Sequence, residues 1–76
     1  MIEVRYFANL KEIRGVESES VDMAGKSIEQ LKQKLTQQYG LPLHAVMSAV
    51  NEEFTSDNYT LQVGDQVAFI PPVSGG

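Results

Sequence analysis

Apolar and polar side chains alternate over residues 2–8, IEVRYFA, at the start of the chain. Ile2, Val4 and Tyr6 fall on one side of this pattern, and Phe7 falls on the other. A period of two is typical of a β-strand that has one face on a core. The pattern therefore predicts a first strand whose inward face carries Tyr6 and whose outward face carries Phe7.

The segment QVAFI, near the end of the sequence, alternates in the same way. Val67 and Phe69 are predicted to point inward, whereas Ala68 and Ile70 are predicted to point outward. If the first and last strands are neighbours, the two outward residues lie beside Phe7. These three residues then form a candidate docking patch for a partner protein. The alternative is that they are ordinary apolar surface residues without a role.

Residues 27–40 carry the clearest helical signal. Ser27 can cap the first turn with its hydroxyl, and Gln30 stands three residues later, which completes a capping box. Apolar residues then recur at helical spacing: Ile28, Leu31, Leu35 and Tyr39. Gly40 is suited to end the helix, because glycine tolerates the left-handed conformation found after many helices. One apolar stripe among Gln, Lys and Glu predicts a helix that packs on a sheet.

The rest of the chain supplies weaker elements and the connections between them. NLKEIRG (9–15) has helical character, and VESESVDM (16–23) is a polar strand suited to a sheet edge. AVMSAVN (45–51) returns to strand character, NEEF (51–54) is a turn, and residues 55–65 form a loop.

The predicted order is strand, strand, helix, strand, short connection and strand. It fits one mixed sheet with one main helix packed across its face, and the first and last strands are natural parallel neighbours. This is the α+β class, in the β-grasp (ubiquitin-like) architecture. A chain of 76 residues has room for one domain. We assign residues 1–70 to that domain and residues 71–76 to an extended tail.

Charge and composition narrow the class of function. Ten acidic and six basic residues give a formal net charge of -4, which disfavours binding to nucleic-acid phosphates. The excess of acid suits a protein partner with a basic cleft, but solubility alone also explains it. No apolar run approaches the length of about 20 residues that spans a bilayer, and the first residues do not resemble a signal peptide. We expect a cytoplasmic protein that binds neither nucleic acid nor membrane.

The side chains offer few candidates for catalysis or metal binding. The sequence contains no cysteine, which excludes a thiolate nucleophile, a thiolate metal site and a side-chain persulfide. His44 is the only histidine, and the adjacent Glu52 and Glu53 diverge if their backbone is extended. We therefore expect no metal site and no bound cofactor, and we expect the reacting group at the end of the chain.

The sequence ends in PPVSGG, and we expect Gly76 to carry a free carboxylate. The prolines have fixed φ angles and lack amide donors, so they end the last strand and direct the tail away from the domain. The six tail residues extend roughly 20 Å. A terminal diglycine can pass through a channel too narrow for larger residues, although an inert terminus is the alternative. The residues predicted to insert into a partner are Pro71, Pro72, Val73, Ser74 and Gly75.

Three segments resemble the MoaD family of ubiquitin-like sulfur carriers, the small subunits of molybdopterin synthase. They are VRYFANLKEIRG, AVNEEF and LQVGDQVAFIPPVSGG, and the similarity in length and element order covers the whole chain. The ending FIPPVSGG is the specific segment, because the diproline is not expected in thiazole sulfur carriers or in tRNA-thiolating ubiquitin-like proteins.

The resemblance implies that the chain is a substrate and not an enzyme. An adenylating enzyme related to ubiquitin-activating proteins uses ATP to convert the Gly76 carboxylate into an acyl-adenylate, and sulfur transfer then makes a thiocarboxylate. The tail next enters the large synthase subunit, in a heterotetramer of two small and two large subunits. There the sulfur is delivered to cyclic pyranopterin monophosphate to build the dithiolene of molybdopterin.

Other functions remain open on the sequence. The sulfur could serve thiamin thiazole synthesis or tRNA thiolation. The chain could instead be a ubiquitin-like modifier joined to lysines through Gly76, or a binding module with an inert tail.

Overall fold

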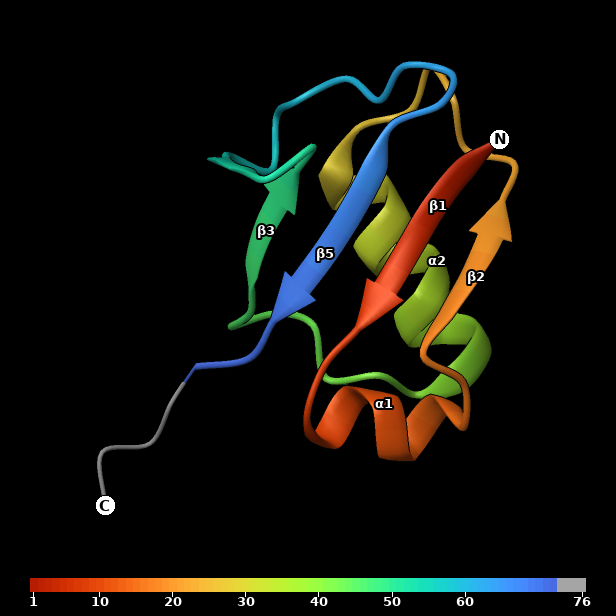
Figure 1. Ribbon diagram of the computed structural model, residues 1–76, viewed down its shortest axis with the longest axis vertical. Coiled ribbons are helices and arrows are strands. Elements are labelled where there is room, and N and C mark those ends of the chain that lie inside the picture. Colours follow the sequence, from red (N-terminus) through yellow and green to blue (C-terminus); the bar gives the residue numbers. More distant parts are fainter. Residues whose placement is uncertain (73–76) are drawn as a thin grey trace.

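The computed structural model describes residues 1–72, and Figure 1 shows the arrangement of its helices and strands. In chain order these are β1 (Ile2–Tyr6), α1 (Asn9–Arg14), β2 (Ser18–Val21), α2 (Ile28–Tyr39), β3 (Met47–Val50), β4 (Glu53–Thr55) and β5 (Gln66–Ile70). The predicted α+β architecture, a mixed sheet with one main helix packed on it, is confirmed.

The strands form one sheet in the order β2-β1-β5-β3-β4. At its centre β1 and β5 pair in parallel, and the other neighbouring strands pair antiparallel. The first and last strands are thus the parallel neighbours that the sequence predicts, and β2 lies at an edge as expected. Figure 1 shows α2 crossing one face of the sheet, with α1 at the end where β1 and β5 finish. Within residues 1–72, no helix covers the opposite face of the sheet.

Apolar side chains from the sheet and from α2 meet in one core. The predicted inward residues of β1 and β5 are at most 2% exposed: Ile2, Val4, Tyr6, Val67 and Phe69. The helix contributes three fully buried residues, Ile28, Leu31 and Leu35. Tyr39 is half-buried and packs against the margin of this core. Leucines from α1 and the loops complete it: Leu10, Leu41, Leu43 and Leu61.

Both ends of α2 have the caps that the sequence predicts. The Ser27 hydroxyl accepts a hydrogen bond from the Gln30 amide at 3.2 Å, and the Ser27 amide donates to Gln30 Oε1 at 2.9 Å. At the other end Gly40 has a φ of 71°, and its amide donates to the Thr36 carbonyl at 2.9 Å. These bonds satisfy backbone groups that would otherwise lack partners, so the sequence fixes where the helix begins and ends.

The structure differs from the prediction at residues 51–54, where the sequence predicts only a turn. Asn51 and Glu52 do form a turn, with positive φ angles of 50° and 72°, but the chain then returns as β4 beside β3. Turns of this kind favour the sequence Asn-Gly. Glu52 stands in place of the glycine, so the sequence does not reveal a hairpin here. Asn51 Nδ2 donates to Asp65 Oδ1 at 2.9 Å, and Asn51 Oδ1 accepts from the Gln66 amide at 3.1 Å. The Asn51 side chain thereby fixes the hairpin to the start of β5.

Three strands are shorter than predicted, and β2 is confined to Ser18–Val21. β1 stops at Tyr6 because Ala8 has a φ of 53°, which lies outside the β region. β3 begins at Met47 because residues 44–45 form a turn. The predicted helical segment after β1 is confirmed as α1, which ends at Gly15 with a φ of 83°.

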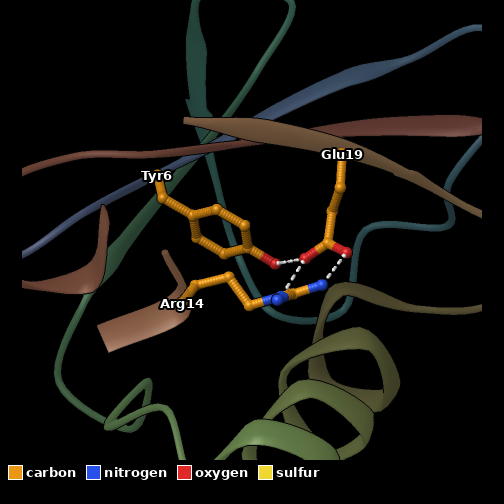
Figure 2. A network of polar contacts seen from close by, with 3 residues as sticks. All are labelled: Tyr6, Arg14 and Glu19. Carbon is orange, nitrogen blue, oxygen red and sulfur yellow. Dashed lines mark hydrogen bonds and ion pairs between the residues drawn. The ribbon is translucent and has the colours of Figure 1, made fainter. Parts of the chain in front are cut away.

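A polar network of Tyr6, Arg14 and Glu19 joins α1 to the sheet, as Figure 2 shows, and Arg14 also contacts α2. The Glu19 carboxylate of β2 accepts a hydrogen bond from the Tyr6 hydroxyl at 2.5 Å. It also accepts from Arg14 Nε at 2.9 Å and from Arg14 Nη2 at 2.8 Å. The Arg14 guanidinium carbon lies 3.8 Å from the centroid of the Tyr39 ring, within the range of a cation–π contact. One carboxylate therefore connects β1, α1, β2 and, through Arg14, α2.

The network also sets the protonation of its members. The hydrogen bonds from Arg14 hold the pKa of Glu19 below its ordinary value of 4.5, and the bond from Tyr6 lowers it further, although burial opposes both. Burial, together with the bond to Glu19, raises the pKa of the Tyr6 phenol. The Glu19 side chain is only 16% exposed, and both of its oxygens accept hydrogen bonds. Glu19 is thus a structural anion and not a general base.

Replacement of Leu31 or Leu35 by alanine is expected to lower the free energy of unfolding by about 2–5 kcal/mol, because each opens a cavity under α2. Gln33→Ala, on the exposed side of the same helix, is the control and should change that free energy by less than about 0.5 kcal/mol. Urea denaturation followed by circular dichroism measures all three. A Leu35→Ala protein as stable as the wild type would show that this side of α2 does not pack on the core.

Glu19→Gln is expected to destabilise the fold by about 1–3 kcal/mol at pH 7, because a neutral amide cannot replace the charge-assisted bonds to Arg14. Folding lowers the pKa of Glu19, so the carboxylate contributes its full stability above 4.5, the ordinary value. That contribution is lost as the pH falls through the lower folded-state pKa. The gap in stability between the wild type and Glu19→Gln should therefore narrow at pH values below 4.5.

Thermal unfolding at a series of pH values measures this gap. Glu17→Gln is the matched control, because Glu17 forms only an exposed pair with Lys11, and it should follow the wild type throughout. A gap between wild type and Glu19→Gln that stays constant down to pH values far below 4.5 would contradict the assigned role of the carboxylate.

Candidate functional site

β1 and β5 finish side by side, and the residues at and beyond their ends form an apolar groove. Its volume is about 480 Å³, and its walls are Phe7, Ala8, Asn9, Ile70, Pro71 and Pro72. Phe7 is 45% exposed despite its large apolar side chain, whereas Ile70 and Pro71 are half-buried. The structure thus brings Phe7 and Ile70 together at the point where the chain leaves the sheet.

Ala68 lies further along the same face of β5. It is half-buried, pairs with Arg5 of β1 and Ala49 of β3, and borders with Phe7 a second depression of about 170 Å³. The outward positions predicted for Phe7, Ala68 and Ile70 are therefore observed, and the three share one face of the sheet. Their role in docking stays a prediction.

The pairing of β3 and β4 extends this apolar surface beyond the predicted patch. Met47 pairs with Ile70, and Ala49 pairs with both Ala68 and Phe54. Directly opposite residues in antiparallel strands point to the same face. Met47 is 53% exposed and Phe54 is 63% exposed. We call the surface formed by five of these residues the apolar face: Phe7, Met47, Phe54, Ala68 and Ile70.

The sequence prediction missed Met47 and Phe54, for different reasons. Phe54 lies in β4, a strand of three residues that follows a turn with an unusual sequence. Met47 lies in β3, where Ser48, Ala49 and Val50 are all buried, so no alternation reveals which side faces outward. The only available signal was the presence of large apolar residues on either side of the Asn51 turn.

Cationic side chains border the apolar face on the β1 side. Arg5 pairs with Glu3 at 3.1 Å, and Lys11 pairs with Glu17 at 3.6 Å. Arg5 and Lys11 line, with Phe7, a depression of about 350 Å³. Exposed ion pairs of this kind are weak, so an acidic group of a partner can compete for either cation.

The tail begins directly beside the groove. β5 ends at Ile70, Pro71 is half-buried, and Pro72 is exposed. Both prolines also line the groove. The predictions made for Val73, Ser74, Gly75 and Gly76 lie outside the described residues.

His44, the only histidine, is exposed and borders a polar groove along α2 together with Lys32 and Asp57. Lys32 Nζ donates to Asp57 Oδ1 at 2.9 Å and to the Val46 carbonyl at 3.4 Å. The Lys32 side chain is 11% exposed, so its ammonium group is committed to these contacts. We assign a structural role to this ion pair.

The remaining acidic residues do not form a catalytic or metal-binding set. Glu52 lies in the left-handed turn, and Glu53 begins β4, where it pairs with Val50. Across residues 1–72, no three histidine, aspartate or glutamate side chains are arranged to hold a metal ion. In the same part of the chain, no helix has the length and apolar character needed to cross a membrane.

Comparison with known proteins assigns a family to this fold and site. The sequence model of the ThiS family matches residues 4–76. The molybdopterin synthase sulfur carrier subunit of Escherichia coli (strain K12) is 36% identical over 81 residues, and the alignment covers 100% of both chains.

Two solved structures resemble the fold closely. A protein from Pyrococcus furiosus superimposes with a TM-score of 0.84 at 25% identity, covering 95% of this chain and 97% of the other. A chain from the complex of subunits 1 and 2 of molybdopterin-converting factor from Helicobacter pylori 26695 has a TM-score of 0.72 at 31% identity, covering 99% and 97%. The predicted family is confirmed: the chain belongs to the ThiS family of β-grasp proteins and, within it, to the group of molybdopterin synthase sulfur carrier subunits.

Proposed function

We propose that this chain carries sulfur as a thiocarboxylate on Gly76 and donates it in the synthesis of molybdopterin. One structural observation carries the proposal: β5 runs out of the exposed apolar face into Pro71 and Pro72, beside an apolar groove. A partner that covers this face receives the tail at the same place. The tail from Pro71 to Gly76 has a reach of roughly 20 Å, enough to enter a pocket in that partner. The family and its full-length relative support the same function.

The chemistry takes place at the terminal carboxylate. An adenylyltransferase related to ubiquitin-activating enzymes binds ATP, and a Gly76 oxygen attacks the α-phosphorus, which releases pyrophosphate and gives an acyl-adenylate. The terminal sulfur of a persulfide donor then attacks the acyl carbon and AMP leaves, which gives an acyl disulfide. A thiol next attacks the donor sulfur of this disulfide, which releases the thiocarboxylate and joins the thiol to the donor in a new disulfide. Sulfur cannot readily displace an oxygen of a free carboxylate, because that oxygen is a poor leaving group. Adenylation provides AMP as a better leaving group. The chain itself binds no cofactor in this scheme, because ATP is held by the partner.

The second partner is the large subunit of molybdopterin synthase. The Helicobacter pylori structure contains subunit 1 together with subunit 2, which supports a partner of this kind. We propose a heterotetramer in which each large subunit takes one tail. The thiocarboxylate sulfur attacks a carbon of cyclic pyranopterin monophosphate and displaces an oxygen substituent, and a second thiocarboxylate supplies the other sulfur of the dithiolene in the same way. Hydrolysis of the acyl group then returns the Gly76 carboxylate. The small subunit acts as a tethered substrate, and the catalytic pocket belongs to the large subunit. A cytoplasmic location stays a prediction.

The two partners use the same apolar face in this proposal. Both must hold the end of the same tail, whose root is fixed beside Phe7 and Ile70. Binding of one partner therefore excludes the other, and the carrier must dissociate between activation and delivery. Exposed and half-buried apolar residues with a cationic border suit a transient interface of this kind, since permanent interfaces are larger and more apolar.

Phe7→Glu and Ile70→Glu are each expected to weaken binding of the large subunit and of the adenylyltransferase by at least about tenfold, because an interface would bury an unpaired carboxylate. Val63→Glu is the matched control, since Val63 is 78% exposed and lies in the turn before β5, at the opposite end of that strand from Ile70. Titration calorimetry measures the affinities and circular dichroism checks the fold. Wild-type affinity in a folded Phe7→Glu protein would refute docking through this face.

Removal of Gly76, or addition of one residue after it, is expected to leave the melting temperature unchanged and to abolish sulfur transfer. One residue moves the terminal carboxylate by about 3.5 Å, and errors of about 1 Å can cost 10²-fold in a catalytic step. Gly75→Val keeps the length but adds a branched side chain, so entry into the pocket should be impaired while the carboxylate stays in place.

A reconstituted reaction with the adenylyltransferase, a sulfur donor, the large subunit and the pterin precursor tests these variants. Intact mass reports the replacement of one oxygen by sulfur, and the yield of dithiolene product reports delivery. A variant without Gly76 that still produces dithiolene would rule out the tethered-substrate mechanism. Sulfur on Gly76 without dithiolene product would favour thiazole synthesis or tRNA thiolation, and isopeptide conjugates would favour a modifier.

A further inference from the structure

The turn after β1 has a backbone conformation that its sequence does not favour. Ala8 has a φ of 53° and a ψ of -130°, and the Phe7 carbonyl accepts a hydrogen bond from the Leu10 amide at 3.1 Å. These angles correspond to the first central position of a type II′ turn. Glycine dominates that position, because a Cβ atom is strained there. The chain has alanine instead.

Both sides of the strained residue are held in place. Before it, Tyr6 is 2% exposed, and its hydroxyl donates a hydrogen bond to the Glu19 carboxylate. After it, Leu10 is fully buried, and Arg14 at the end of α1 binds the same carboxylate through two nitrogens. Figure 2 shows Tyr6 and Arg14 reaching this carboxylate from two different elements. Strained backbone persists only where its surroundings impose it, and here the core and the network impose it.

The strain lies at the candidate site. Ala8 directly follows Phe7 and forms part of the wall of the groove that also contains Ile70 and Pro71. Glycine would adopt this turn without strain, but it would also gain many other conformations. Alanine restricts the turn to few conformations and supplies a methyl group to the groove wall. The backbone that carries Phe7 is therefore held in place before any partner binds.

We propose that Ala8 is a positioning residue of the docking surface: its turn holds Phe7 outward, over the root of the tail, so that a partner meets a preformed apolar groove. This inference rests on the proposed docking function of Phe7. Its physical effect is to reduce the conformational freedom that is lost on association. Ala8 acts in this way through Phe7, and it takes no part in the chemistry at Gly76.

A double-mutant cycle with Ala8→Gly and Phe7→Ala tests the proposal, using the full chain and the large synthase subunit in titration calorimetry. Ala8→Gly should weaken binding by about tenfold in the wild type, but by less than about twofold in the Phe7→Ala background, because the effect passes through Phe7. The melting temperature of Ala8→Gly should be equal to or higher than that of the wild type, since strain is relieved.

Ala24→Gly is the matched control for the added backbone freedom. Ala24 follows the end of β2, which pairs with the start of β1, so it lies at the other end of the sheet from Phe7. This variant should bind with wild-type affinity.

The outcomes separate this inference from the proposed function. If Phe7→Ala binds like the wild type, docking through Phe7 is wrong and the role of Ala8 fails with it. If Phe7→Ala binds weakly but Ala8→Gly binds normally, only the positioning role is overturned. The same conclusion follows if Ala8→Gly has an equal effect with and without the Phe7 side chain, because Ala8 would then act independently of Phe7.

Discussion

The parallel pairing of β1 with β5 is the contact on which the rest of the structure depends. It aligns Val4 with Val67 and Tyr6 with Phe69, and all four are at most 2% exposed against the helix side of the sheet. Because the strands are parallel, both finish at the same end of the sheet. Phe7, directly after β1, and the two prolines directly after β5 therefore lie beside the same groove. The apolar face and the origin of the tail are two consequences of this one pairing.

The end of β1 places a structural residue directly beside the proposed docking residue. Tyr6 points inward and connects to Glu19, whereas Phe7 points outward to the groove. The division follows from the alternation of a strand, and the turn at Ala8 stops that alternation after Phe7. The proposed docking residue, Phe7, is thereby placed next to Tyr6, which is only 2% exposed. That arrangement gives an exposed aromatic side chain a rigid base, which flexible loops do not offer.

Sequence patterns predicted the parts of this structure that depend on local chemistry. The caps of α2, the inward positions of β1 and β5, and the outward positions of Phe7, Ala68 and Ile70 follow from spacing and hydrogen-bonding capacity. Features that depend on contacts between distant residues were missed. Tyr6 meets Glu19, which lies 13 residues further along the chain, and Asn51 in the turn between β3 and β4 binds Asp65 and Gln66 at the start of β5. No local pattern contains these contacts, so Met47 and Phe54 could not be assigned to the apolar face from the sequence.

The central place of β5 also has a consequence for how the protein is made. During translation, β1, β2, α2, β3 and β4 all leave the ribosome before β5 does. Until then β1 and β3 each have an unpaired inner edge, and the gap between them can be filled only by residues 66–70. The sheet therefore closes only after β5 has been made, and until then its two unpaired inner edges are open to incorrect strand pairing.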